Sequence, residues 1–275
     1  MNKVAVIGAV GDSVFLSVKN FHAGGETIQA ESFHYELGGK GFNQAIAANR
    51  FGAQTFFLGA IGKVNFDKVN NYLKKEGIDS CLIKKDGDSS FAVIITDSKG
   101  SNRVTVYNGV QLEINDLKHY INYIVDADVL LLNNEVPEEV NLEAARIAKA
   151  NNTKVILNPA PYRKICDELT ILIDFFTPNE HELIGLEEFQ NVIVTLGEKG
   201  CMNCFDKEII PVRKVRAIDT TGAGDTFNGV FAAMIANNKS IKEACLTANT
   251  AASIMVTRKY VIDSIPYKKE ILHLI

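Results

Sequence analysis

Short runs of wholly apolar residues alternate with stretches of helical periodicity along much of the chain. Residues 129–132 and 155–157 are apolar throughout, and residues 137–151 between them repeat apolar positions at helical spacing. Because a strand buried on both faces shows no polar alternation, this pattern is typical of a parallel sheet covered by helices on both sides. Further strands of this sheet are predicted at residues 4–8, 55–58, 175–176 and 192–194. The expected fold class is therefore α/β, with a mostly parallel sheet between two helical layers.

Further helices are predicted at residues 40–51, 222–236 and 241–256, and Pro266 is expected to open a last short helix. Nothing repeats at a fixed period, and no stretch rich in Pro, Gly and Ser divides the chain. We therefore expect one domain over residues 1–275.

Two segments interrupt the alternation of strands and helices. Residues 13–35 and 91–107 are rich in β-branched and aromatic residues, and the second segment folds back around a turn at residues 97–100. Hairpins inserted between βα units do not belong to a parallel sheet, so these segments are expected to form a small β-layer at its edge. Such a layer is either a lid over a ligand site or a decorative edge, and the pattern alone favours neither.

The same segments bear on the oligomeric state. Two sets of residues alternate along these strands and are expected to face opposite sides. One set is Val93, Ile95, Val104 and Val106, and the other is Ala92, Ile94, Thr105 and Tyr107. A projecting sheet that is partly apolar on both faces cannot bury both against its own domain. We expect a homodimer that pairs through these strands, with Val104 at an outward position.

Composition and charge narrow the class of protein. The 275 residues are 47% hydrophobic, which excludes a disordered chain, and 29 Lys and Arg against 33 Asp and Glu give a net charge of −4. The chain therefore lacks the positive field that nucleic-acid binding requires. It also lacks an apolar run of about 18 residues and a signal-peptide layout, so we expect a cytoplasmic protein with no membrane partner.

The five cysteines are odd in number, which suits thiols in a reducing compartment. Cys201 and Cys204 form a CxxC pair, but they lie in a predicted strand, where positions i and i+3 face opposite ways. We therefore interpret them as structural thiols rather than as zinc ligands.

Residues 219–229 form the sharpest motif, a run of small residues that leads directly into a helix. The free amides of a first helical turn and the positive end of the helix dipole make a site for an anion. Asp225 within this turn has two readings. It is either an N-terminal cap or a base that accepts the proton of an attacking hydroxyl, and the motif alone does not separate them.

Residues 38–44 form a second glycine-dense helix start. It is either a flexible turn or a site in which backbone donors, Lys40 and Asn43 hold hydroxyl or phosphate groups. Known nucleotide motifs do not explain it, since the chain has no GxxxxGK[ST], no HRD and no DFG, and residues 8–11 lack the third glycine of a dinucleotide fold.

Together, the two motifs resemble the signatures of the ribokinase-like (phosphofructokinase B-type) carbohydrate kinases, and residues 219–225 match the second signature closely. The likeness covers nearly the whole chain, since residues 25–27, 158–161, 177–182, 194–200 and 256–259 fall where that family has similar segments. This likeness implies a three-layer fold with a β-sheet lid. It also implies an ATP-dependent kinase that phosphorylates a hydroxyl of a small sugar, with ribose as the first expected acceptor. The alternatives are a nucleoside or sugar-phosphate acceptor, or a catalytically silent sugar-binding relative.

The resemblance also implies roles for individual residues. Asp225 is the expected base, with the amides of Gly222, Ala223 and Gly224 as the anion hole. The expected sugar site contains Asp12, Ser13, Gly38, Gly39, Lys40, Asn43 and Glu135. The expected ATP site adds Asn179, Thr195, Gly197, Gly200 and Asn249. Glu182, Asp219 and Thr221 are candidates for Mg²⁺ or a monovalent cation such as K⁺. Taken singly, Asn179, Glu182 and Asn249 also fit helix caps or solvated polar residues.

The chain departs from the family pattern at two places that matter for the site. Family members have an Asn and an Asp two apart after the first strand, whereas here Gly11 and Ser13 stand at those positions and the acid is Asp12. A shift of one residue along a strand reverses the side-chain direction, so Asp12 is expected to point away from the sugar. Tyr260 replaces a glycine of the loop that helps to build a potassium site in the family.

Overall fold

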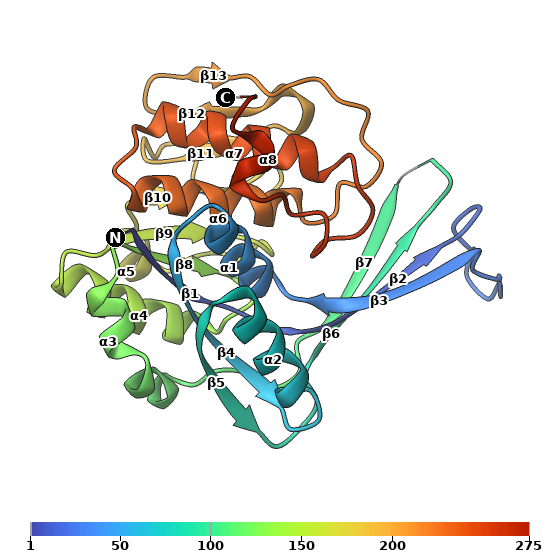
Figure 1. Cartoon of the computed structure of the whole chain (residues 1–275), viewed down its shortest axis with the longest axis horizontal. Helices are drawn as coiled ribbons and strands as arrows, with labels where there is room; N and C mark the ends of the chain where they lie inside the picture. The colour runs from blue at the N-terminus through green and yellow to red at the C-terminus, as the bar shows by residue number, and fades with distance from the viewer. Residues whose placement is uncertain (1, 100, 275) are drawn as a thin grey trace.

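Six parallel strands form the centre of the computed structural model, which describes residues 2–99 and 101–274 (Figure 1). Their order across the sheet is β10-β9-β8-β1-β4-β5. Their bounds are β1 Lys3–Ile7, β4 Gln54–Gly62, β5 Asp79–Lys85, β8 Val129–Asn133, β9 Lys154–Asn158 and β10 Phe175–Phe176. All neighbouring pairs in this sheet are parallel, which confirms the α/β class.

Helices cover both faces of this sheet. One layer contains α1 (Lys40–Arg50), α2 (Phe66–Glu76), α6 (Ala223–Ala236), α7 (Ile241–Met255) and α8 (Lys268–Ile271). The other contains η1 (Ile114–His119), α3 (Ile121–Asp126), α4 (Glu138–Ala150) and α5 (Asp167–Thr170). Residues of one strand alternate between the two cores: Val4 and Val6 pack in the first, and Ala5 and Ile7 in the second. This alternation explains why the strands are apolar throughout.

The helices predicted at 40–51, 137–151, 222–236 and 241–256 correspond to α1, α4, α6 and α7, and α8 follows Pro266. Helix α2 was not predicted. It buries Val69 and Leu73 fully while most of its other residues are polar, so its periodic signal is short.

The strand predicted at residues 192–194 belongs mainly to another sheet. β11 (Ile193–Thr195), β12 (Cys201–Asn203) and β13 (Glu208–Ile210) form a separate antiparallel sheet, with η2 (Gly197–Lys199) between the first two. A single bridge from Phe176 to Val192 joins this sheet to β10. Cys201 packs in one core and Cys204 packs against the other, as expected for opposite faces, and all five cysteines are free thiols.

Four strands form a third sheet that projects from the rest of the molecule, and we call it the lid (Figure 1). Its order is β3-β2-β6-β7, with bounds β2 Gly11–Ser17, β3 Ser32–Gly38, β6 Ser90–Thr96 and β7 Asn102–Tyr107. β2 and β6 are parallel, and the two outer pairs are antiparallel. The small β-layer is therefore confirmed, although its first two strands run from residue 11 to residue 38. Gly100, in the predicted turn, lies outside the described residues.

The two faces of the lid differ in what they contact. The inner face carries Phe15 and His34, whose rings pack against the Tyr260 ring at centroid distances of 5.4 and 3.6 Å. The placement of Val104 at an outward position was wrong. Val104 pairs with Ile94, which pairs with Phe15, so Val104 belongs to the inner face. The expected grouping of Val93 and Ile95 with Val104 and Val106 fails for the same reason, because directly paired residues share a face.

No helix in the described part of the chain has the length and apolar character needed to cross a membrane.

Candidate active site

Asp225 lies in the first turn of α6, with its side chain buried. The helix begins after Gly222, whose φ of +81° is a left-handed conformation that suits glycine. Gly222 is the cap residue, and no side chain caps this helix. The capping alternative for Asp225 is therefore wrong, and its carboxylate is free for other partners at the positive end of the helix dipole.

Two amides of helix α1 hold the Asp225 carboxylate. Asn43 donates from Nδ2 to Oδ2 at 2.9 Å, and Gln44 donates from Nε2 to Oδ1 at 3.3 Å. Gln44 also donates to Asn158 Oδ1 at 3.1 Å, and Asn158 donates to the Thr177 carbonyl at 3.0 Å. Each carboxylate oxygen thus has a buried donor, which orients the group.

Helix α1 begins where lid strand β3 ends. Its cap residue Gly39 has a φ of +110°, and a Cβ there would lie 2.4 Å from the Ala9 carbonyl oxygen. Only glycine fits this turn, which brings Lys40 beside Glu135. The Lys40 amide donates to Glu135 Oε2 at 2.7 Å.

Lys40 and Glu135 form the charged part of the site with Asp225. Burial acts to lower the pKa of the Lys40 ammonium, but Asp225, Glu135 and Glu182 together raise that pKa above its usual value. Burial raises the pKa of the Glu135 carboxyl to about 7, against the opposing effects of the Lys40 charge and amide. The cation therefore stays charged near neutral pH, while the protonation of Glu135 changes there.

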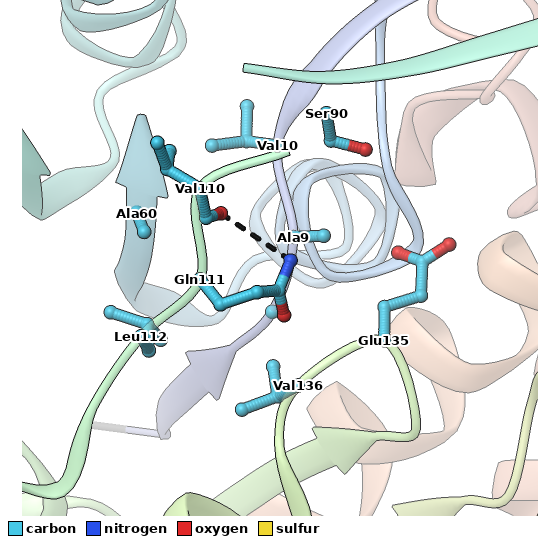
Figure 2. Close-up of a pocket in the computed structure, with 10 residues that line it drawn as sticks. Ala9, Val10, Ala60, Ser90, Val110, Gln111, Leu112, Glu135 and Val136 are labelled. Atoms are coloured by element: carbon cyan, nitrogen blue, oxygen red, sulfur yellow. Dashed lines mark hydrogen bonds between the residues drawn. The ribbon is translucent and has the colours of Figure 1, made fainter. Parts of the chain in front are cut away.

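Glu135 also borders a small hollow below the lid (Figure 2). The Gln111 amide, the Ser90 hydroxyl and the apolar side chains of Ala9 and Val136 surround it. Its volume of about 10 Å³ leaves room for about one water molecule. The hollow adds polar groups at the edge of the candidate sugar site but is too small to hold a sugar.

A large cleft of about 1040 Å³ lies on the other side of the α6 amino end. It is lined by the expected ATP-site residues Asn179, Thr195, Gly197, Gly200, Ala223, Gly224 and Asn249. Drug-sized ligands occupy pockets of about 300–1,000 Å³, so the cleft has room for a nucleotide. The backbone amide of Ala223 donates a hydrogen bond to the Thr220 carbonyl at 3.3 Å. Gly224 has no side chain, so it borders the cleft with its backbone.

The local contacts separate the alternatives for three of these residues. Asn179 and Glu182 bind each other's backbone: Asn179 Oδ1 accepts from the Glu182 amide at 3.0 Å, and Glu182 Oε2 accepts from the Asn179 amide at 3.0 Å. The cap-like role is therefore present for this pair. Asn249 is neither a cap nor solvated, because it is buried in α7 and donates to the Ile210 carbonyl at 2.9 Å.

Asp12 and Ser13 point in opposite directions, as expected. The Asp12 carboxylate accepts hydrogen bonds from Asn65, the cap residue of α2, and from Lys68 within that helix. Ser13 is buried on the inner face of the lid, and its hydroxyl lies against Gly38. We therefore retain Ser13 in the candidate sugar site and remove Asp12.

Asp219 and Thr221 lie at the turn before α6. Asp219 accepts from the Thr221 amide at 2.9 Å and from the Tyr260 amide at 3.1 Å. Thr221 meets the lid, because its hydroxyl lies 3.5 Å from Asn102 Nδ2. Within the described residues, no three or more His, Cys, Asp and Glu side chains cluster as a metal site.

Sequence reasoning assigned no role to Gln44 or Glu36. Gln44 follows Asn43 directly in the second glycine-dense motif, and this position is the sequence feature that could have identified it as a site residue. Glu36 reaches the amides of Val261 and Ile262 at 2.9 and 3.2 Å. No local pattern indicates this contact, because its partners lie 225 and 226 residues along the chain.

Comparison with known proteins gives consistent matches over nearly the whole chain. The model of the family described as pfkB family carbohydrate kinase matches residues 1–188 and 185–268. The ribokinase of Haemophilus influenzae is 35% identical over 296 residues, covering 98% of this chain and 97% of that protein. The structure of ribokinase from Thermotoga maritima is similar with a TM-score of 0.87 at 33% identity, covering 98% of both chains. Arabidopsis thaliana ribokinase complexed with ribose and ATP has a TM-score of 0.84 at 27% identity, covering 99% of this chain and 98% of that one.

Proposed function

Because this chain belongs to the pfkB family of carbohydrate kinases, we propose that it transfers the γ-phosphate of ATP to a hydroxyl of ribose. The observation that carries the proposal is the position of Asp225. Its buried carboxylate lies at the amino end of α6, between a nucleotide-sized cleft and the turn where the Lys40 amide donates to Glu135. This is where a base for phosphoryl transfer to a hydroxyl has to be.

The residues around Asp225 have separate roles in the proposed reaction. Asp225 accepts the proton of the attacking hydroxyl, and Asn43 and Gln44 hold its oxygens in one orientation. Glu135, Ser13 and the backbone at Gly38 and Gly39 bind and orient the sugar hydroxyls. The orientation of the Asp225 carboxylate matters most, because phosphoryl transfer depends mainly on positioning and charge neutralisation.

The charge that develops on the transferred group needs donors and cations. Lys40 supplies a cation that its three carboxylate neighbours keep protonated. Gly222, Ala223 and Gly224 are proposed as the anion hole at the positive end of the α6 dipole. ATP supplies the phosphoryl group and Mg²⁺ neutralises its phosphates when both are bound. Asn179 orients the Glu182 carboxylate through its backbone amide, and the carboxylate oxygen of Glu182 that this bond does not use is a hard donor that suits a partly hydrated Mg²⁺.

The turn before α6 contains the candidate residues for a potassium ion, Asp219 and Thr221. Both oxygens of the Asp219 carboxylate already accept backbone amides, and Tyr260 supplies one of these amides in place of the glycine of the family pattern. We propose that Asp219 and Thr221 hold this loop without a monovalent cation. Turnover should therefore change by less than about twofold when NaCl replaces KCl at equal ionic strength, where both salts screen charges equally.

The direct test is ATP consumption by the full chain with Mg²⁺, measured against a panel of pentoses, hexoses, nucleosides and sugar phosphates. Ribose should give the highest kcat/KM. Faster turnover with a nucleoside would replace the proposed acceptor and leave the chemistry intact. Equal ATP consumption with and without every acceptor would favour the silent sugar-binding relative.

We also propose that two copies of the chain pair through the lid. The outer face of the lid exposes four aromatic residues, with Phe33 64%, Tyr35 42%, Phe91 37% and Tyr107 58% exposed. An apolar face of this kind invites a partner, and a second lid related by a two-fold axis offers the same surface. A cytoplasmic location is proposed on the five free thiols and the need for ATP.

A further inference from the structure

The segment that follows α7 makes an unusual set of backbone contacts. Three successive amides, of Tyr260, Val261 and Ile262, donate to carboxylates: the first to Asp219 at 3.1 Å, and the next two to Glu36 at 2.9 and 3.2 Å. Tyr260 has a φ of +68°, which is uncommon for a residue with a side chain. We call Tyr260, Val261 and Ile262 the clasp loop.

The clasp loop packs directly on the anion hole. A Cβ added to Gly222 would lie 2.6 Å from Cγ1 of Val261, so the two residues are in close contact. Val261 is itself buried. Because buried side chains are close-packed, a shift of Val261 would move Gly222 and the first turn of α6.

The lid also holds the clasp loop. Glu36 lies on the inner face of β3, and its side chain is only 10% exposed. On the same face, the His34 ring stacks on Tyr260 at a centroid distance of 3.6 Å. Gly38 and Gly39 of the candidate sugar site follow Glu36 by two and three residues, and Gly38 ends strand β3.

The energetics favour a specific role for the Glu36 carboxylate. Burial raises its pKa to about 7, although the two amides act to lower the pKa. A buried carboxylate is costly unless it is hydrogen-bonded, and bonds from amides to a charged acceptor are among the stronger ones. The clasp loop thus supplies the two hydrogen-bond donors of the Glu36 carboxylate, and Nε2 of His34 lies 3.7 Å from its Oε2.

We propose that Glu36 is a positioning residue: it fixes the clasp loop from the lid and thereby holds the anion hole at Gly222 in its reactive geometry. The inference rests on the proposed phosphoryl transfer. It links the sugar side of the site to the phosphate side through a single strand, so that the lid and the anion hole take up their positions together. Glu36 itself touches neither reacting group.

The test compares Glu36→Ala and Glu36→Gln with the matched control Glu31→Ala, which alters an exposed glutamate just before β3. With ribose and ATP, Glu36→Ala should lower kcat roughly 10–100-fold, because small misplacements of reacting groups have effects of this size. Both KM values should stay within about threefold, since only the transition-state contact is lost. Glu36→Gln should recover part of kcat, because its amide oxygen accepts one of the two bonds.

Hydrogen exchange in the ligand-free protein supplies a readout that does not depend on turnover. The Val261 and Ile262 amides should exchange faster in Glu36→Ala than in the parent or in Glu31→Ala. If Glu36→Ala does not fold, Val261→Ala carries the test, because it removes the contact to Gly222 and should lower kcat in the same way.

Three results would overturn the inference. A kcat within about threefold of the parent, at any melting temperature, would mean that Glu36 only stabilises the fold. A loss confined to the KM for ribose would make Glu36 a substrate ligand instead. Unchanged exchange at Val261 and Ile262 would show that the clasp does not hold in solution. If the parent itself shows no sugar-dependent ATP consumption, the proposed function fails first and this inference fails with it.

Discussion

The side-chain amide of Asn43 lies 2.9 Å from the carboxylate of Asp225, although the two residues are 182 positions apart. Each comes from one of the two glycine-dense helix starts, so this hydrogen bond joins the candidate sugar site to the candidate phosphate site. Helices α1 and α6 pack against each other along their lengths, and this packing fixes the distance between the two starts.

Replacing Asp225 tests the proposed base. Asp225→Asn should lower kcat roughly 10²–10⁴-fold, because the amide cannot accept the hydroxyl proton. Nucleotide binding, measured by calorimetry, should survive, since the cleft is unchanged. Asp86→Asn is the control, because that carboxylate lies on the surface with its side chain 88% exposed. A kcat for Asp225→Asn within about threefold of the parent would remove Asp225 from the mechanism.

Gln44 should matter for the orientation of Asp225. Gln44→Met keeps a similar length but removes the donor to Asp225 and to Asn158. We expect kcat to fall roughly 10–100-fold with little change in either KM, because the base remains but is no longer held. The exposed Gln54 provides the matched control, Gln54→Met. Equal kcat values for the two variants would contradict this role.

The pKa of about 7 for Glu135 predicts a pH dependence of sugar binding. Below pH 7 the carboxyl is mostly protonated and loses acceptor capacity, and above pH 7 it is ionised and accepts hydroxyl hydrogen bonds. The KM for ribose should therefore fall as the pH rises through about 7.

Steady-state kinetics between pH 6 and pH 8, about one unit on either side of that pKa, measure this effect. Glu135→Gln should remove the change in KM, whereas Glu139→Gln on the exposed side of α4 should keep it. A KM that still falls with pH in Glu135→Gln would assign the titration to another group.

The lid predicts the oligomeric state. Light scattering at micromolar concentration should give about twice 30.2 kDa for the parent. Tyr107→Glu should shift the protein towards monomer, because Tyr107 shares the outer face with Phe91. Val104→Glu is the matched control on the same strand, since Val104 lies on the inner face. A monomeric parent with full activity, or a monomer produced equally by both variants, would contradict pairing through the outer face.

The sequence by itself determined the general architecture and the motifs. Strands buried on both faces have to be apolar throughout, so residues 129–132 and 155–157 identified the parallel sheet. Local features also identified the hairpin at residues 91–107 and the helix starts at Lys40 and Ala223. These signals are local, because they depend on the periodicity and turn chemistry of neighbouring residues.

The tertiary structure alone decided which face of each lid strand meets the rest of the molecule. A period of two shows that Asp12 and Ser13, or Val104 and Thr105, point opposite ways, but it does not say which way is inward. Cross-strand pairing and the contact of Phe15 with Tyr260 settle that direction. The contacts of Glu36 with Val261, and of Gln44 with Asp225, join residues far apart in the chain, so no local pattern could predict them.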